Sequence, residues 1–394
     1  MRTPTDAVET DWAPLSGLRG QAESRLGPLL DDAIALLRVE SPSSDLAAVA
    51  TSADAVAALL EERLGAAPER IVVDGVSHLR LCFGGPTKVL ILAHHDTVWP
   101  HGTLSSLPAR VSDGVLRGPG SVDMKTGIAM AVHALRILRD QGRSLDGVTV
   151  LVTGDEEVGS TASRALIEET AAGAAAVLVL EAGGDDGQLK TERKGVSMYR
   201  ITAHGLASHA GLAPDAGVNA VVGLADVVLK LAALHGTEPG LTVVPTVIQG
   251  GTTTNTVPAE GWVDVDVRAT TSASQLRCDA AIRALTAEVP GVVLDVDGGV
   301  NREPLEAAAS AELFARARRL AAAHGLGVVE PLAVGGGSDG NFTAALGVPT
   351  LDGLGAWGGG AHADGEHAVV AGLAPRMALL AALIDEVLSE GRTP

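Results

Sequence analysis

Cysteine is nearly absent from this chain. Its 394 residues hold only two, Cys82 and Cys278. Two cysteines cannot build a disulfide framework or a cysteine-rich zinc site. Both are expected to act as small buried hydrophobic residues, as in a protein from a reducing compartment.

Aromatic and basic residues are also scarce. Four tryptophans, three phenylalanines and one tyrosine leave a core that must be built from Ala, Val and Leu. The 29 basic residues face 48 acidic ones, a formal charge of −19, so the chain would repel a phosphate backbone and nucleic acid is excluded as a partner. No apolar run is long enough to span a bilayer, and the N-terminal segment 1–17 contains no apolar leader. We therefore expect a cytoplasmic protein that does not associate with membranes.

The length predicts two or three domains. Residues 29–37, 45–64, 124–139 and 161–170 have the pattern of helices. Continuous or β-rich apolar runs near residues 70–73, 78–83, 88–93, 148–153 and 176–180 are typical of buried strands. Because these strands alternate with helices, the sequence predicts an α/β domain with a mainly parallel sheet.

The pattern changes after residue 195. A strand (198–206), a helix (218–235), two strands (242–249 and 261–269), a helix (272–289) and a strand (292–296) give the order β-α-β-β-α-β, which is ferredoxin-like. Residues 272–275 have the form of a capping box. The α/β pattern then resumes with helices at 307–325 and 373–388 and a strand at 348–352. We predict a discontinuous catalytic domain (1–195 and 306–394) that carries an inserted α+β domain (196–305).

Histidines and carboxylates follow buried strands or lie in glycine-rich loops at five places. These residues are His94 with Asp96, Asp123, Glu156 with Glu157, Glu181, and His362. Each motif alone has a structural explanation, such as a helix N-cap for Asp123 or a charged helix start for Glu156 and Glu157. All five occur in one chain, in this order, each near a junction of strand and loop.

The carboxyl ends of parallel strands open onto one crevice, so these groups are expected to converge there. Several carboxylates cannot stay ionised at close range without compensation. One or two divalent metal ions would provide it, and mixed His and carboxylate ligands suit zinc best, with cobalt or manganese also possible.

This order of motifs resembles the co-catalytic zinc amidohydrolases and peptidases that include glutamate carboxypeptidase, aminoacylase, acetylornithine deacetylase and succinyl-diaminopimelate desuccinylase. The resemblance covers nearly the whole chain. It is most specific at His94-X-Asp96, at 123–127 (Asp-Met-Lys-Thr-Gly) and at Glu156-Glu157. Residues 207–211 (Ala-Ser-His-Ala-Gly) resemble the histidine motif of the family's lid domain.

The resemblance implies a dinuclear zinc centre. His94 and Glu181 would hold one ion, Glu157 and His362 the other, and Asp123 would bridge the two. By the same resemblance, Asp96 would orient His94, a role with a general physical basis. Glu156 would be the general base that takes a proton from a metal-bridging water.

The resemblance also implies substrate contacts in the inserted lid and dimerisation domain. His209 would reach the site of a neighbouring subunit in a homodimer and steady the oxyanion, and Asn255 would help bind the substrate. Arg268 resembles the family's arginine for the substrate carboxylate, although it could instead pair with Asp264 or Asp266. Gly337 and Ser338 lie in a glycine cluster (335–340) whose N–H groups can cradle an anion. Ser338 could also be only a turn residue.

The chain departs from the glutamate carboxypeptidases after Glu181, where Ala182 replaces a common proline, and neither Lys190 nor Lys194 is in clear register for an acidic substrate side chain. The resemblance still favours that branch. It implies a hydrolase that cleaves an amide bond to release an amino acid from a peptide or an N-acyl amino acid. The alternative is a deacylase of the acetylornithine or succinyl-diaminopimelate type. A phosphoesterase would need a basic clamp that the sequence lacks, and an inactive scaffold would show broken motifs.

Overall fold

The computed structural model describes residues 15–390. The N-terminal segment that is expected to lack an apolar leader lies mostly outside these residues. Contacts divide the chain into two compact units. The first contains the chain up to Lys190, Ala311–Pro331 and the chain from Val348 onward; the second contains Thr191–Ser310 and Leu332–Gly347. The domain boundaries expected at 195/196 and 305/306 remain a prediction.

The second unit includes residues 332–347 because polar contacts tie this segment to both ends of the insert. Arg193 donates to the carbonyl oxygens of Gly336 and Gly337 at 3.2 and 3.3 Å. The Asn341 amide donates to the carbonyl oxygens of Lys194 and Glu303 at 3.2 and 2.6 Å. Sequence periodicity carries no signal for contacts of this kind.

The first unit is built on a six-stranded sheet. Its strand order is β1 (Glu69–Val73), β2 (Val76–Cys82), β6 (Val148–Thr153), β3 (Val89–His94), β7 (Ala176–Val179) and β16 (Thr350–Leu351). Strands β6, β3, β7 and β16 run parallel to one another. Strand β2 is antiparallel to both of its neighbours, β1 and β6. Every residue of β3, β6 and β7 is buried, which explains their continuous apolar sequence. The predicted α/β class with a mainly parallel sheet is confirmed.

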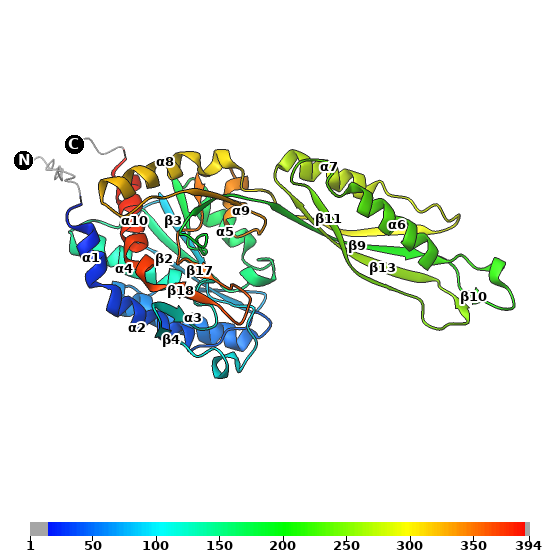
Figure 1. Ribbon diagram of the computed structural model, residues 1–394, viewed down its shortest axis with the longest axis horizontal. Coiled ribbons are helices and arrows are strands. Elements are labelled where there is room, and N and C mark those ends of the chain that lie inside the picture. Colours follow the sequence, from blue (N-terminus) through cyan, green and yellow to red (C-terminus); the bar gives the residue numbers. More distant parts are fainter. Residues whose placement is uncertain (1–14, 391–394) are drawn as a thin grey trace, which may run out of the picture. The chain divides into compact units, whose positions relative to one another are not determined.

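Helices α3 (Leu46–Leu64), α4 (Lys125–Asp140) and α10 (Val370–Ser389) pack against this sheet, with α4 in contact with the other two (Figure 1). The remaining helices that lie wholly or mostly in this unit are α1 (Leu18–Ser24), α2 (Leu26–Leu37), α5 (Arg164–Ala171) and α8 (Ala307–Ala323). A small antiparallel sheet has the order β17 (Gly358–Gly359), β18 (His367–Val369), β5 (Val115–Arg117) and β4 (Arg110–Ser112). Short 3₁₀ turns lie at Thr103–Ser105 and Glu156–Val158.

The second unit has the predicted ferredoxin-like order. Its antiparallel sheet runs β11 (Thr242–Gly250), β13 (Glu260–Ala269), β9 (Gly195–His204) and β14 (Val293–Arg302). Helices α6 (Ala220–Leu234) and α7 (Ser272–Arg283) lie along one face (Figure 1). Alternate residues of β9 and β13 are buried beneath them, as expected for a sheet that is covered on one face. The shorter elements are β10 (Ser208–His209), β12 (Thr256–Val257), a 3₁₀ turn (Pro214–Ala216) and α9 (Gly340–Ala345). Strands β8 (Leu189–Arg193) and β15 (Pro331–Val334) pair with each other.

Helix α7 is shorter than predicted and is capped differently. It ends at Arg283 instead of residue 289, because the following backbone is held by other groups: Lys230 binds the Thr286 carbonyl oxygen, and Asp226 accepts from the Glu288 N–H. Thr271 is the N-cap and accepts from the Ser274 N–H. The side chain of Gln275, expected in a capping box, instead donates to Ser197 and to the Arg302 carbonyl oxygen.

The two cysteines differ in burial. Cys278 is buried in the core of the second unit, as predicted, but Cys82 is exposed, so that prediction was wrong. Cys82 is the last residue of β2, where the strand leaves the sheet. Among the described residues, no helix combines the length and apolar character needed to cross a membrane.

Candidate metal centre

Three neighbouring parallel strands deliver most of the candidate ligands to one edge of the sheet. His94 is the last residue of β3 and is in register with Thr153, the last residue of β6. Glu156 and Glu157 follow β6, and Glu181 follows β7, which pairs with β3 on its other side. The strand order β6-β3-β7 therefore places these side chains together at the carboxyl ends of the strands, as expected for an α/β site.

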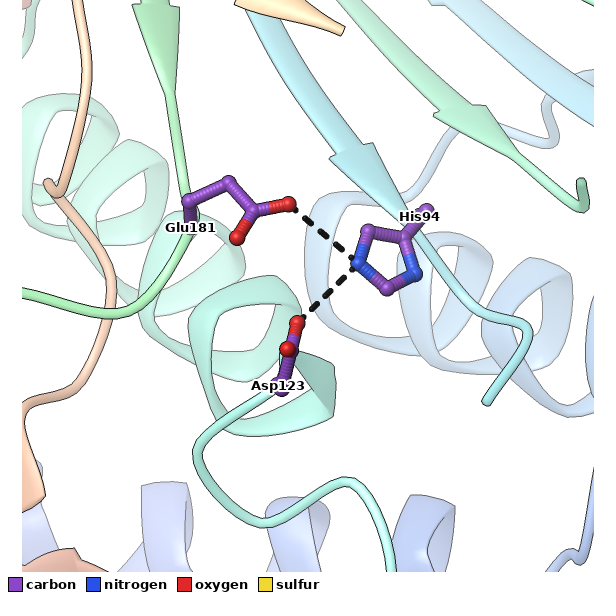
Figure 2. Close-up of side chains that lie close together, drawn as sticks. All are labelled: His94, Asp123 and Glu181. Atoms are coloured by element: carbon purple, nitrogen blue, oxygen red, sulfur yellow. Dashed lines mark hydrogen bonds and ion pairs between the residues drawn. The ribbon is translucent and has the colours of Figure 1, made fainter. Parts of the chain in front are cut away.

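His94, Asp123 and Glu181 form the first group that could hold a metal ion. The Nε2 atom of His94 lies 3.3 Å from Asp123 Oδ1 and 3.4 Å from Glu181 Oε1 (Figure 2). His94 and Glu181 are buried, and Asp123 is largely buried, in the loop before α4. One imidazole nitrogen and two carboxylate oxygens thus point at a common position, a donor set that suits zinc.

Asp123, Glu157 and His362 form a second group, with Asp123 shared between the two. The His362 Nε2 atom lies 3.3 Å from Asp123 Oδ2 and 3.1 Å from Glu157 Oε2. The two oxygens of Asp123 therefore face different histidines. The structure brings together all five predicted metal ligands, in the pairing that the resemblance implies.

The carboxylates of both groups create a negative potential at the two histidines. Burial alone would lower the pKa of His94, but its contacts with Asp123, Asp96 and Glu181 outweigh burial and raise it well above the usual value. Contacts with Asp123 and Glu157 raise the pKa of His362 to about 10. Burial raises the pKa of Glu157, and its buried Oε1 atom has no hydrogen-bond partner within residues 15–390. Three carboxylates at this spacing call for positive charge, and divalent ions fit these donors.

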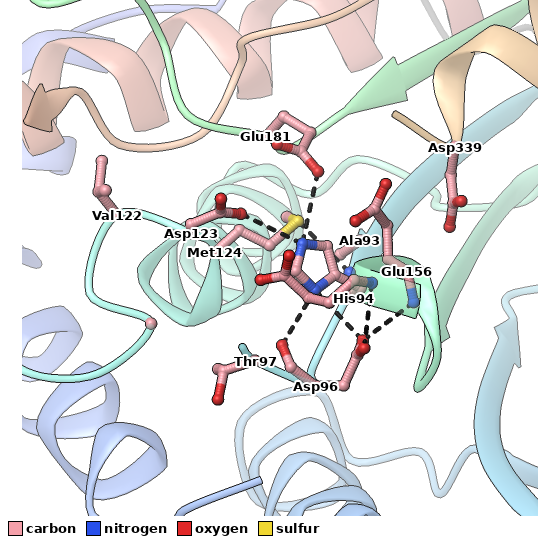
Figure 3. A network of polar contacts seen from close by, with 12 residues as sticks. Ala93, His94, Asp96, Thr97, Val122, Asp123, Met124, Glu156, Glu181 and Asp339 are labelled. Carbon is pink, nitrogen blue, oxygen red and sulfur yellow. Dashed lines mark hydrogen bonds and ion pairs between the residues drawn. The ribbon is translucent and has the colours of Figure 1, made fainter. Parts of the chain in front are cut away.

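Asp96 connects His94 to the segment that carries Glu156 and Glu157. Its Oδ1 atom lies 3.4 Å from His94 Nδ1 and accepts from the Glu156 N–H at 3.2 Å (Figure 3). Its Oδ2 atom accepts from the Glu157 N–H at 3.2 Å. Ser43, which sequence reasoning missed, donates to the same carboxylate at 2.7 Å. Asp96 is fully buried, and its carboxylate contacts both the ring of His94 and the backbone of the 3₁₀ turn at Glu156–Val158.

Glu156 is the first residue of that 3₁₀ turn and is largely buried. Its backbone is fixed by Asp96, and it precedes the candidate ligand Glu157 directly. Asp155 stabilises the same segment by accepting from the N–H groups of Ala162 and Ser163 at 2.7 and 3.2 Å. The residue predicted to be the general base therefore sits on a backbone held from both sides.

A further buried carboxylate, Glu366, holds the loop that carries Asp123. It accepts from the N–H groups of Gly120, Val122 and Asp123 and from Trp99 Nε1. Sequence reasoning gave this residue no role. Its only signal was its place in the polar segment that contains His362, because nothing in the local pattern shows which loop it would bind.

His209 and Asn255 lie side by side in the second unit. Strand β10 pairs with β12, and the Ala210 N–H donates to the Asn255 carbonyl oxygen at 2.9 Å. The Nδ1 atom of His209 accepts from the N–H groups of Gly211 and Leu212, both at 3.1 Å. A ring whose Nδ1 is an acceptor carries its proton on Nε2, so the exposed His209 presents an N–H donor.

The other predicted substrate residues in this unit have internal partners. Arg268 forms a bidentate pair with Asp266, with both distances 2.8 Å, which is one of the alternatives left open by the sequence. Ser338 is buried; its Oγ accepts from the Gly340 N–H, and its own N–H donates to Asn341 Oδ1. Gly337 lies between β15 and α9. Their roles in substrate binding remain predictions.

A parallel sheet that gathers two overlapping His and carboxylate groups at its carboxyl edge is the arrangement of a metal-dependent enzyme. The model of peptidase family M20/M25/M40 matches residues 90–386. The chain belongs to this family, which is metal-dependent, typically with zinc, and the protein is a hydrolase.

Curated relatives agree with this assignment. Carboxypeptidase G2 of a Pseudomonas species is 34% identical over 319 residues, which cover 78% of this chain and 75% of that protein. Succinyl-diaminopimelate desuccinylase of Corynebacterium glutamicum is 28% identical over 196 residues, which cover 47% of this chain and 52% of that protein. The first relationship thus spans most of each chain, whereas the second covers about half of each.

Solved structures share the fold. Aminopeptidase PepT of Bacillus cereus has a TM-score of 0.73 at 23% identity, covering 92% of this chain and 99% of its own. An M20 family metallo-carboxypeptidase of Sulfolobus solfataricus has a TM-score of 0.66 at 15% identity, covering 91% and 99%. These likenesses confirm the α/β fold with its inserted α+β unit.

Asp96→Asn should weaken metal binding by about 10- to 100-fold, the usual effect of removing a partner of a ligating histidine. The amide cannot accept at both positions, so His94 and the Glu156–Glu157 backbone lose their common anchor. Competition with a chromogenic chelator measures the affinity. Ser43→Ala removes only one donor to Asp96 and should cause a smaller loss; equal effects of the two variants would contradict the assigned role.

Proposed function

We propose that this protein is a dinuclear zinc hydrolase that cleaves an amide bond and releases an amino acid. The observation that carries this proposal is the shared aspartate: Asp123 directs one oxygen toward His94 and the other toward His362. A carboxylate used in this way suits two metal ions close together, as in two-metal hydrolytic sites. His94 and Glu181 would hold one ion, and Glu157 and His362 the other. Cobalt or manganese could replace zinc with the same donors.

Bound metal ions would polarise the substrate carbonyl and acidify water. The protein supplies the proton transfer and the orientation. The carboxylate of Glu156 would accept the proton of the attacking water and pass it to the leaving amine nitrogen, because it lies beside the ligand Glu157 on a fixed turn. Asp96 would keep the ring of His94 and this turn in register. The Nε2–H of His209 from a neighbouring subunit would donate to the oxygen that becomes negative during attack on the carbonyl.

The extent of the similarity supports a carboxypeptidase-like substrate. The match to carboxypeptidase G2 covers 75% of that protein, whereas the match to the desuccinylase covers about half. We therefore propose a peptide or N-acyl amino acid substrate, with Asn255, Arg268, Gly337 and Ser338 as its contacts in the second unit. The alternative is a deacylase of the acetylornithine or succinyl-diaminopimelate type, which the desuccinylase match favours.

We also propose a homodimer formed through the second unit. Strand β11 is an edge of its sheet, and an edge strand offers unpaired backbone groups to a second strand. The adjacent helix α6 exposes Val222 and Leu229, which are 53% and 71% exposed, and Ile248 of β11 is 57% exposed. An apolar surface beside a free edge suits a self-complementary interface. A cytoplasmic location remains a prediction.

Metal content tests the centre. The purified chain should contain about two zinc ions by elemental analysis, and a chelator should abolish amide hydrolysis.

Glu156→Gln should retain both ions and lose about 10²- to 10⁴-fold in kcat, because only the proton acceptor is removed. Undiminished turnover by this variant would exclude Glu156 as the base, and a chain that takes up no metal would refute the centre.

A substrate panel separates the two branches. Peptides and folyl- or aryl-acyl amino acids should be hydrolysed with higher kcat/KM than N-acetyl and N-succinyl amino acids of the same amine. Release of the free amino acid measures both. Preference for the short acyl donors would favour the deacylase alternative without affecting the metal centre.

Leu229→Glu should convert the dimer to a monomer, because a carboxylate on the exposed face of α6 cannot be buried without a partner. Size-exclusion chromatography with light scattering measures the mass. Leu276→Glu provides a matched control, since Leu276 is 60% exposed on α7 of the same unit. A wild-type chain that elutes as a monomer would refute the proposed dimer.

A further inference from the structure

Glu366 is fully buried beside the candidate metal centre, but its geometry differs from that of a ligand. Its Oε1 atom accepts from the N–H groups of Val122 and Asp123 at 2.9 and 3.2 Å. Its Oε2 atom accepts from the Gly120 N–H at 3.0 Å and from Trp99 Nε1 at 2.6 Å. Each oxygen therefore has two N–H donors, which occupy its lone pairs and leave the carboxylate directed at the backbone of one loop.

The bound loop carries the aspartate that the two groups share. Residues 118–124 lead into α4, and Asp123 donates its own backbone N–H to Glu366 while its side chain faces both histidines. A carboxylate that receives several backbone N–H bonds fixes a loop strongly, because these bonds are charge-assisted. The position of the Asp123 backbone thus depends on Glu366.

Glu366 also lies on the hairpin that carries His362. Gly359 pairs with His367 across this hairpin, and the turn between them is closed by bonds from the Ala363 N–H to the Gly360 carbonyl oxygen and from the Glu366 N–H to the Ala363 carbonyl oxygen, both 2.9 Å. His362 itself is half exposed, with a positive φ of 61°, and its contacts in the centre are the two carboxylates of its group. The pairing of β18 with β5 holds the base of this hairpin, and the Glu366 carboxylate ties its turn to the loop of Asp123.

We propose that Glu366 is a positioning residue that fastens the hairpin of His362 to the loop of Asp123 and thereby sets the affinity for the metal ion between them. This inference rests on the proposed dinuclear centre. His94 ends strand β3 of the main sheet and Glu181 follows strand β7, and none of the four hydrogen bonds of the Glu366 carboxylate reaches these strands. If the Asp123 loop shifts, an ion there would keep two ligands, His94 and Glu181, that Glu366 does not hold, whereas an ion in the other group would keep only Glu157. The ion at Glu157 and His362 depends on the fastening.

The test is a metal titration of the full-length chain after its metal has been removed with a chelator. Zinc is added in competition with a chromogenic chelator to wild type and to Glu366→Gln. The glutamine keeps the volume of the side chain but directs an NH₂ group at N–H donors, so the fastening fails. We expect wild type to bind two ions, and the variant to bind the first ion within threefold of wild type and the second at least tenfold more weakly.

Two further variants keep the result decisive. Asp385 is a buried residue of α10 in the same unit, and its carboxylate forms an ion pair with Arg143 at 3.0 Å. Asp385→Asn removes this carboxylate and should leave the affinities for both zinc ions unchanged. Trp99→Phe removes only the indole donor to Glu366, and should give a partial loss for the second ion with an unchanged circular dichroism spectrum. If Glu366→Gln fails to fold, the Trp99 variant decides the inference.

Each outcome points to one proposal. A wild-type chain that binds fewer than two ions refutes the proposed dinuclear function. The role of Glu366 is overturned if wild type binds two ions and Glu366→Gln binds the second ion as tightly as wild type. If Glu366→Gln does not fold, the same result with Trp99→Phe overturns it. An equal loss in Asp385→Asn also overturns it, since the effect would then be a general loss of stability. At saturating zinc, Glu366→Gln should regain kcat with KM unchanged, which a damaged substrate site would not allow.

Discussion

Negative charge concentrated at the carboxyl edge of one sheet is the constraint around which the first unit is organised. Asp123, Glu157 and Glu181 lie within reach of two imidazoles, and these contacts raise the pKa of both histidines. Such a cluster is costly for a folded chain unless cations compensate it. The parallel sheet keeps the charges in place because β3, β6 and β7 are buried along their whole length.

Hydrogen bonds to buried carboxylates hold the loops that the sheet does not reach. Asp96 accepts from the backbone of Glu156 and Glu157, and Glu366 accepts from the backbone around Asp123. In both cases a carboxylate outside the two candidate ligand groups orders the segment that carries members of those groups. Carboxylates at this edge therefore serve either as candidate metal ligands or as acceptors that hold a loop. The number of N–H donors around a carboxylate distinguishes the two uses.

Much of the fold could be predicted from the sequence because its signals are local. Buried parallel strands have continuous apolar sequences, and the insert shows the order β-α-β-β-α-β. The five candidate ligands could be found because they follow strands or occur in motifs of a known family. The end of α7 at Arg283 and the contacts of Ser43 and Glu366 could not be predicted, since each depends on a partner distant in sequence. The exposure of Cys82 could not be predicted either, because the local apolar pattern does not mark it as the last residue of its strand. For Arg268 the sequence offered two partners, and the structure pairs it with Asp266.

The order of the candidate ligands along the chain has a consequence for synthesis. His94, Asp123, Glu157 and Glu181 all precede the inserted unit, whereas His362 and Glu366 follow it. A chain that emerges from the ribosome therefore presents three of the carboxylates before the second histidine and Glu366 exist. Before the insert is made, only the group of His94, Asp123 and Glu181 can be complete. The group that contains His362 can be completed only after the whole insert has been synthesised.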